Sequence, residues 1–144
     1  RARLPQNVQE KLRETEEHTI NNSAMTMVVA LSYSSRWELT NAMKEVASEV
    51  KEGKLNIDDI TEATMESHLV TSFMPDPELL IRTGGEVRVS NYMLWQIAYS
   101  ELYFCETYWP DFDEEDLHNA ILSYQKRQRR FGKTEEQVES NDNK

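Results

Sequence analysis

The sequence predicts an α/β fold in which helices cover a mostly parallel sheet, and three observations support this prediction. Segments with apolar residues at helical spacing alternate with short apolar runs typical of strands. The run 25–33 is mostly apolar and contains Val28 and Val29, which indicates a strand buried on both faces. Another apolar run, 79–81, leads into a loop with glycines and arginines. Open α/β sheets place their ligand loops at the carboxyl ends of strands.

The first predicted helix spans residues 5–20. Pro5 suits a first helical turn, and Val8 and Leu12 fall on one face of the helix. Its charged residues are expected to form a solvated face. The polar residues 21–23 predict a turn before the apolar run that follows.

Helical spacing returns over residues 39–50, where leucine, methionine and valine recur on one face. Gly53 is expected to end this second helix. Residues 56–70 predict two short helical pieces. Thr61, followed by a glutamate, marks the start of the second piece, because threonine side chains cap helix N-termini.

The second half of the chain predicts a strand over 79–81, a helix over 91–99, a strand over 102–105 and a long helix over 113–131. Acidic residues begin the long helix and basic residues end it, which complements the helix dipole. One stripe of this helix is expected to face the core: Leu117, Ile121, Tyr124, Gln128 and Phe131. Residues 133–144 are polar and are expected to form a disordered tail.

Residues 82–91, called the arginine loop below, have the composition of a diphosphate-binding loop. Two glycines allow close approach of the backbone, and the loop can offer N–H groups to an anion. Arg82 and Arg88 can each bind two phosphate oxygens. Ser90 or Asn91 is expected to cap the next helix. The loop matches neither a P-loop nor a dinucleotide-binding fingerprint. The alternative is a βα turn whose arginines pair with surface carboxylates.

Composition and charge limit the classes of function. The 144 residues are enough for one domain with a real core, and their net charge is −10 with a pI of about 4.8. Such an acidic chain disfavours nucleic acid as its main partner, although basic residues cluster in the arginine loop and over 126–130. The sequence contains no apolar run long enough to span a membrane.

Cysteine and histidine form no pattern typical of a catalytic or metal site. Cys105 is the single cysteine, which excludes an intrachain disulfide, and it is expected to act as a small apolar residue in a buried strand. His18, His68 and His118 are far apart in the sequence and have no spacing typical of a catalytic triad or of metal ligands.

Several strings in the second half of the chain, taken in order, resemble the cis-prenyltransferase family, in particular its bacterial undecaprenyl diphosphate synthases. The resemblance is specific over residues 75–132 and extends more loosely back to Leu4. The matching strings are PELLIRTGGE at 77–86, RVSNYMLWQ at 88–96, AYSELYF at 98–104, WPDF at 109–112 and RRFG at 129–132.

The resemblance implies a reaction, a cofactor and partners. The family condenses isopentenyl diphosphate onto an allylic diphosphate, typically farnesyl diphosphate, and adds cis isoprene units to make undecaprenyl diphosphate, a precursor of the cell-wall lipid carrier. It implies Mg²⁺ as cofactor and a homodimer. It also implies a cytoplasmic protein that contacts the inner face of the membrane transiently, through its lipid product.

The resemblance also assigns residues to the two diphosphate sites. Arg82, Arg88 and Ser90 match the family positions that hold isopentenyl diphosphate. Arg130 and Gly132 match a C-terminal Arg-x-Gly motif that reaches into the diphosphate site of the partner subunit. The alternative for this pair is a glycine-closed helix end with an arginine near the dipole.

Five further positions match the family. Glu101 matches a glutamate tied to Mg²⁺ and substrate binding, and its oxygen ligand suits that ion. Glu86 and Asp111 are weaker candidates near the diphosphate, with backbone or helix capping as the alternative role for each. Met25 and Val29 match positions that line the product tunnel, where ordinary strand core is the alternative.

Two departures from the family pattern qualify these assignments. Residues 33–37 read Tyr-Ser-Ser-Arg-Trp where the family commonly has Tyr-Gly-Gly-Arg, so Ser34 or Ser35 would be strained if the turn needs positive φ. The family's Met-Asp-Gly-Asn-Gly-Arg-Trp-Ala segment, with its catalytic aspartate, has no counterpart here. We therefore assign no catalytic residue and expect residues 1–132 to be the C-terminal part of one domain, unable to complete the reaction alone.

Two other interpretations remain open from the sequence. The chain could be a non-catalytic partner subunit of a heteromeric cis-prenyltransferase, although such subunits tend to lose the site residues that are present here. It could also be a phosphate-binding or structural α/β domain that shares only the fold, because fold alone does not imply function.

Overall fold

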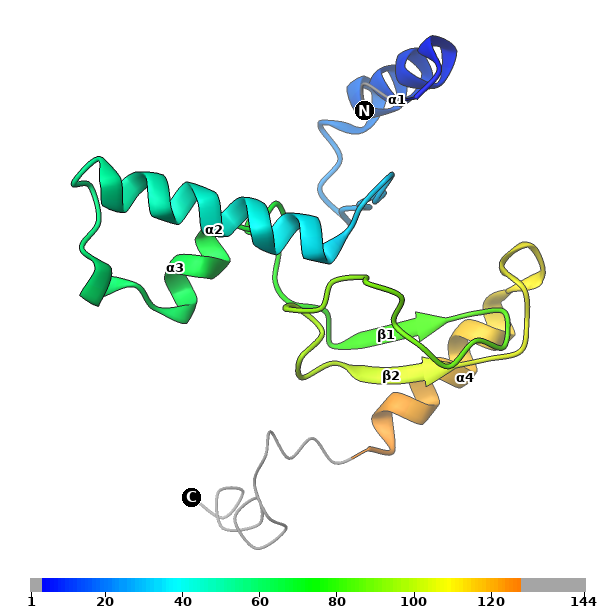
Figure 1. Ribbon diagram of the computed structural model, residues 1–144. Helices are drawn as coiled ribbons and strands as arrows, with labels where there is room; N and C mark the ends of the chain where they lie inside the picture. The colour runs from blue at the N-terminus through cyan, green and yellow to red at the C-terminus, as the bar shows by residue number, and fades with distance from the viewer. Residues whose placement is uncertain (1–3, 128–144) are drawn as a thin grey trace, which may run out of the picture. The chain divides into compact units, whose positions relative to one another are not determined.

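The computed structural model describes residues 4–127, and the chain divides into two compact units between Tyr33 and Ser34 (Figure 1). The first unit contains helix α1 (Gln6–Thr19). The amides of the first helical turn donate to the carbonyl oxygen of Pro5, at 3.0 and 3.1 Å. The helix predicted over residues 5–20 is confirmed.

The strand predicted over residues 25–33 is wrong. This segment has no regular secondary structure, and the side chains of Met25, Met27 and Val29 are exposed. A strand is defined by hydrogen bonds to a neighbouring strand, and no described residue provides that pairing for this segment. Apolar composition indicates that a segment favours burial. It does not show that a neighbouring strand is present to pair with it.

The second unit begins with α2 (Ser35–Lys51). The helix starts earlier than the spacing predicted, because the Ser34 hydroxyl caps it and accepts a hydrogen bond from the Trp37 amide at 3.4 Å. It ends shortly before Gly53, whose φ of +70° is the left-handed conformation expected at a helix end.

Two short helical pieces follow, as predicted for residues 56–70. They are the 3₁₀ turn η1 (Ile57–Asp59) and helix α3 (Glu62–Ser67). Thr61 caps α3 in a reciprocal arrangement with Thr64, since each side chain bonds the backbone amide of the other residue.

A two-stranded parallel sheet forms the centre of the second unit. Strand β1 (Leu79–Arg82) pairs with β2 (Glu101–Phe104) in the register Leu79 to Glu101 and Arg82 to Phe104. Both predicted strands and their parallel direction are confirmed. Cys105 lies one residue beyond β2 and is half-buried, not inside a buried strand as expected.

The helix predicted over residues 91–99 is wrong. The segment is a series of turns, with a single helical-type bond from the Ile97 amide to the Met93 carbonyl at 2.9 Å. Positive φ angles at Ser90, Asn91 and Met93, of 48°, 60° and 46°, explain the difference, because a right-handed helix requires negative φ.

Helix α4 (Glu114–Gln125) follows η2 (Trp109–Asp111) and lies beside β2 in Figure 1. The Asp113 carboxylate caps the helix by accepting from the amides of the two residues after Glu114, at 2.9 and 3.2 Å. The helix ends at Gln125, before the predicted boundary at 131. The predicted tail falls outside the described residues.

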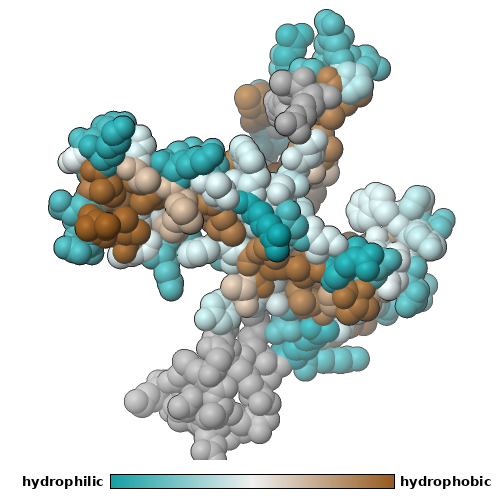
Figure 2. All heavy atoms as spheres, viewed as in Figure 1, coloured by the Kyte–Doolittle hydropathy of each residue, from teal (hydrophilic) through white to brown (hydrophobic). Residues whose placement is uncertain are grey.

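The core of the second unit is small. Its buried apolar side chains come from α2, from the residues just after α3, from the turns that follow the arginine loop and from α4. They are Ala42, Val46, Leu69, Met93 and Ala120. Leu117 and Ile121, predicted to face the core, are 42% and 38% exposed, because α4 packs through Ala120 instead. Figure 2 shows that apolar side chains, in brown, also reach the viewed surface.

Among the described residues, no helix combines the length and the apolar character that a membrane span requires. The longest helix, α2, has 17 residues and several charged side chains.

Candidate functional site

The arginine loop begins at the carboxyl end of β1, as predicted, and lies against the segment that follows β2. The amide of Gly84 donates to the Thr107 carbonyl at 2.8 Å, and the amide of Gly85 donates to the Cys105 carbonyl at 2.9 Å. These two of the loop's amides are therefore already bonded and are not available to an anion. The glycines extend the pairing of the two strands into their loops.

Gly85 also has a steric reason to be glycine. Its φ is +74°, and a Cβ atom at this position would lie 2.6 Å from Oε2 of Glu106. Any larger residue would therefore force the Glu106 side chain to move and would strain the backbone. The close approach that the sequence suggested is to a protein carboxylate.

Arg82 and Ser90, two of the predicted site residues, contact each other. Arg82 Nη1 donates a hydrogen bond to Ser90 Oγ at 2.8 Å and another to the carbonyl oxygen of Arg88. Arg82 is half-buried, and these two bonds to its own loop orient the guanidinium. A guanidinium has further N–H donors on its other nitrogens, and these can bind an anion.

Arg88 lies in a different environment. Its side chain is 62% exposed, and Nη1 lies 2.5 Å from Oε2 of Glu86. This contact matches the alternative prediction that an arginine of the loop pairs with a surface carboxylate. Exposed ion pairs contribute about 0–1 kcal/mol, so an incoming diphosphate can replace Glu86 at little cost.

Asn91 was expected to cap a helix that follows it. It instead accepts hydrogen bonds from the first turn of α2. Its Oδ1 accepts from the Arg36 amide at 2.9 Å, and its carbonyl oxygen accepts from the Ser35 amide at 3.0 Å. Its Nδ2 donates to Ser34 Oγ at 2.9 Å. The contact joins residues 55 to 57 positions apart, which explains why local pattern alone missed it.

The two serines that replace the glycines of the family are not strained. Ser34 has an extended backbone with φ of −149°, and Ser35 is the first residue of α2. The positive φ falls at Ser32 instead, at 56°. The condition for strain, a positive φ at Ser34 or Ser35, is therefore not met.

Glu101 lies away from the arginine loop. The strand register puts Glu101 at the amino end of β2 and Arg82 at the carboxyl end of β1, and side-chain alternation puts them on opposite faces. Glu101 Oε2 accepts from Arg127 Nη1 at 2.9 Å. In residues 4–127 no group of three or more His, Cys, Asp or Glu side chains could hold a metal ion. These residues therefore do not fit a preformed Mg²⁺ site.

The remaining predicted residues are not assembled with the loop. Asp111 is exposed in η2, and its alternative role as a helix cap belongs to Asp113. Met25 and Val29 lie in the irregular segment of the first unit. Arg130 and Gly132, with the Arg-x-Gly motif, lie outside the described residues.

Sequence reasoning missed a buried polar cluster between α2 and the segment after the arginine loop. Glu38 is 1% exposed and Gln96 is 3% exposed. Gln96 Nε2 donates to Glu38 Oε2 at 3.1 Å and to Thr71 Oγ1 at 2.7 Å. The available signal was that Glu38 shares a helix face with the buried residues Ala42 and Val46.

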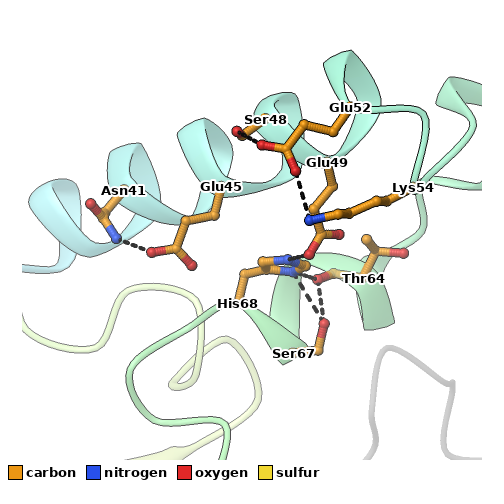
Figure 3. A network of polar contacts seen from close by, with 9 residues as sticks. All are labelled: Asn41, Glu45, Ser48, Glu49, Glu52, Lys54, Thr64, Ser67 and His68. Atoms are coloured by element: carbon orange, nitrogen blue, oxygen red, sulfur yellow. Dashed lines mark hydrogen bonds and ion pairs between the residues drawn. The ribbon is translucent and has the colours of Figure 1, made fainter.

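A second polar cluster joins α2 to the end of α3 (Figure 3). His68 Nε2 lies 3.2 Å from Oε1 of Glu49, and Nδ1 lies 2.8 Å from the carbonyl oxygen of Thr64. The Thr64 carbonyl, followed by Glu49, raises the pKa of His68 above its usual value. Both partners accept hydrogen bonds, so the two contacts together favour the imidazolium form.

A cavity of about 410 Å³ lies between α3 and the segment before β1, and none of the predicted site residues lines it. Its lining includes Glu66 and Asp76. Burial, with a smaller contribution from the charge of Glu66, raises the pKa of Asp76 above its ordinary value. These two carboxylates do not by themselves identify a ligand for the cavity.

Comparison with known proteins gives a consistent set of relatives. The family described as "Putative undecaprenyl diphosphate synthase" matches residues 1–132. An isoprenyl transferase from Porphyromonas gingivalis is 48% identical over 143 residues, which cover 99% of this chain and 56% of that protein. A ditrans,polycis-undecaprenyl-diphosphate synthase ((2E,6E)-farnesyl-diphosphate specific) from Pasteurella multocida is 48% identical over 129 residues, covering 90% and 54%. The chain spans about half the length of these curated relatives.

Two solved structures are also similar. Lavandulyl diphosphate synthase from Lavandula x intermedia, crystallised with dimethylallyl diphosphate, has a TM-score of 0.85 and 40% identity, over 92% of this chain and 57% of that one. A probable undecaprenyl diphosphate synthase from Campylobacter jejuni has a TM-score of 0.73 and 34% identity, over 92% and 59%. These similarities confirm the predicted α/β fold class.

Proposed function

The chain belongs to the undecaprenyl diphosphate synthase family of prenyltransferases, and from this premise we propose that its arginine loop binds the diphosphate group of isopentenyl diphosphate. The observation that carries the proposal is the pairing of Arg82 with Ser90 at the carboxyl end of β1, beside the exposed Arg88. These are the three residues that the family resemblance assigned to this substrate.

The two arginines have complementary parts in the proposed binding. Arg82 is held by Ser90 and the Arg88 carbonyl, so its free donors meet the diphosphate without first being ordered. Arg88 leaves Glu86 and adds a second guanidinium, which binds phosphate oxygens as a fork. The two positive charges together stabilise a diphosphate within a chain whose net charge is −10.

The reaction that we propose for this binding is the prenyl transfer of the family. Isopentenyl diphosphate would be condensed onto an allylic diphosphate, with undecaprenyl diphosphate as the product. The name of the Pasteurella multocida relative, which specifies (2E,6E)-farnesyl diphosphate, supports farnesyl diphosphate as the allylic substrate. Within this reaction the arginine loop binds and orients one substrate, and no described residue is assigned a bond-making step.

Mg²⁺ enters the proposal only through Glu101. A carboxylate completed by diphosphate oxygens is a ligand set that Mg²⁺ takes in proteins. The described residues supply one such carboxylate, and Arg127 already neutralises it. No step of the proposal therefore passes through the ion.

The proposal extends to the assembly only through the family resemblance. It includes a homodimer in which Arg130 and Gly132 reach the partner's diphosphate site. It also includes a cytoplasmic location, with transient membrane contact made through the lipid product. From the resemblance alone, Asp111 is proposed to lie near the diphosphate, and Met25 and Val29 to line the product tunnel. Glu86 is proposed as the carboxylate that the diphosphate displaces from Arg88.

Isothermal titration of the chain with isopentenyl diphosphate tests the central claim. We expect Arg82→Ala to weaken binding by roughly 10- to 150-fold, because a hydrogen bond to a charged group contributes about 1.5–3 kcal/mol. Arg13→Ala, which removes an exposed arginine from α1, is the matched control and should bind as the parent chain does. Equal affinity of Arg82→Ala and the parent would remove Arg82 from the site. Absence of binding by the folded parent would mean that the site needs the family's N-terminal segment, or would favour the non-catalytic partner subunit.

A further inference from the structure

We propose that Asn91 is a positioning residue, which together with Ser34 and Ser35 holds the arginine loop in its diphosphate-binding conformation. The inference rests on the proposed function, because it concerns the same loop. We call the contact of these three residues the Asn91 clasp. It joins the far end of the loop to the first turn of α2.

Four hydrogen bonds make up the clasp and its immediate surroundings. Asn91 accepts from the amides of Ser35 and Arg36, at 3.0 and 2.9 Å, and donates to Ser34 Oγ at 2.9 Å. Ser35 Oγ accepts from the amide of Leu94 at 2.9 Å. Asn91 therefore bonds through both its backbone and its side chain. These bonds connect the end of the arginine loop to the start of α2.

The clasp is anchored in the core. Ser35 is 0% exposed, and Met93, two residues beyond Asn91, is 7% exposed. In contrast, the loop residues Arg88 and Ser90 are exposed. The exposed part of the loop is thus held between β1 at one end and a buried contact at the other.

The backbone of this segment needs such a contact. Ser90, Asn91 and Met93 all have positive φ, at 48°, 60° and 46°. Residues other than glycine rarely adopt this conformation, and they keep it only where surrounding contacts hold them there. Asparagine tolerates it best of the three, which suits Asn91 to the central position.

The clasp acts on the proposed site through Ser90. Ser90 directly precedes Asn91 and receives the hydrogen bond from Arg82 at 2.8 Å. If Asn91 leaves α2, Ser90 moves with it, and the Arg82 guanidinium loses a partner that orients it. If the loop adopts its binding conformation only part of the time, its apparent Kd equals the intrinsic Kd divided by the fraction of time spent in that conformation.

The hydroxyl groups of the clasp come from Ser34 and Ser35. Ser34 and Ser35 stand where the related motif commonly has two glycines, which have no side-chain oxygen to receive Nδ2 of Asn91 or the Leu94 amide. The serine pair thus adds side-chain partners to a contact that two glycines would make through the backbone alone.

The test uses Asn91→Gly in the whole chain, because glycine keeps the positive φ while it removes the side-chain contacts. Isothermal titration with isopentenyl diphosphate should show affinity about tenfold weaker, the loss expected for two hydrogen bonds of ordinary strength. Hydrogen exchange without ligand should be faster over residues 83–90. Asn91→Asp should restore both, because Oδ1 still accepts from Arg36 and the Ser34 hydroxyl can donate to the other oxygen.

Asn56→Gly is the matched control, since Asn56 also makes one side-chain hydrogen bond, to Asp59, in a loop that precedes a short helical turn. This variant should leave both the affinity for isopentenyl diphosphate and the rate of hydrogen exchange over residues 83–90 unchanged. Unchanged exchange in Asn91→Gly overturns the clasp, and faster exchange with unchanged affinity overturns its positioning role. If the parent chain binds no isopentenyl diphosphate, the proposed function fails. The exchange measurement alone then supports or overturns the clasp.

Discussion

Arg82 and Arg88 differ in how much of their binding geometry exists before a ligand arrives. Arg82 is half-buried and bonded to Ser90, whereas Arg88 is exposed and paired with Glu86. Sequence pattern gave these arginines the same role, because both stand in one loop at a strand end. Their different environments mean that substitutions around each should have different effects on binding.

Removing the competing carboxylate should strengthen binding at Arg88. Glu86→Gln leaves the size of the side chain unchanged but removes the charge that holds Arg88 Nη1. We expect affinity for isopentenyl diphosphate to rise by up to about fivefold, since an exposed pair contributes no more than about 1 kcal/mol. Titration at low and high salt measures this change, which should shrink as salt screens the pair.

The matched control for this prediction is Glu17→Gln, whose carboxylate pairs with Arg13 on the exposed side of α1. It changes the net charge by the same amount and should leave affinity unchanged. Weaker binding in Glu86→Gln would contradict the prediction and would indicate that Glu86 orients Arg88 for the ligand.

At the scale of elements, one titrating side chain, His68, bonds α2 to the end of α3. His68 donates from both ring nitrogens only when it is protonated, to Glu49 on α2 and to the Thr64 carbonyl on α3. The Thr64 carbonyl and then Glu49 raise the pKa of His68 above the unfolded value of 6.5. This contact therefore stabilises the folded state more at low pH than at high pH.

The sign of the pH dependence follows from linkage. The folded state holds the His68 proton more tightly than the unfolded state, so the stabilisation is complete below about pH 6.5 and is lost as pH rises through the raised pKa. Urea unfolding across this range should show the decline, and His68→Gln should flatten it. His118→Gln, which removes an exposed histidine of α4, should retain it. Equal pH dependence in His68→Gln and the parent would contradict the assignment.

Within the whole molecule, the ion pair of Glu101 with Arg127 ties the start of β2 to the residues just after α4. It lies at the opposite end of the sheet from the arginine loop. The register thus separates the residue predicted to contact Mg²⁺ from the residues predicted to bind isopentenyl diphosphate. Any joint action of the two sets requires a ligand or chain segment that reaches both.

This separation predicts two independent effects of Glu101→Gln. The free energy of unfolding should fall by less than about 1 kcal/mol, because both side chains are partly exposed to solvent. Affinity for isopentenyl diphosphate without Mg²⁺ should not change. Urea unfolding and isothermal titration measure the two quantities, and a repeat with Mg²⁺ shows whether the ion acts through Glu101.

Arg127→Ala provides the companion measurement. If the two side chains stabilise each other, the double variant should lose less free energy of unfolding than the sum of the two single losses, as in a double-mutant cycle for interacting groups. A loss of affinity in Glu101→Gln without Mg²⁺ would contradict the separation that the register indicates.

The sequence by itself determined the family and most of the local elements. The ordered strings over residues 77–132 identified the relatives that the comparisons confirm. Pro5 at the start of α1 and Thr61 at the start of α3 were readable because caps and first turns involve residues only a few positions apart. The parallel sheet followed from the alternation of helix and strand patterns.

Tertiary structure decided the features that depend on distant residues. The apolar run at 25–33 is not a strand. Its composition could not show this, because composition carries no information about a pairing partner. The segment 91–99 is not a helix, because Asn91 bonds to the start of α2 and the backbone around it turns with positive φ. The Glu101 contact with Arg127 also joins residues far apart in sequence. Residue types told us which groups can bind a diphosphate, and only long-range hydrogen bonds decided how each one is held.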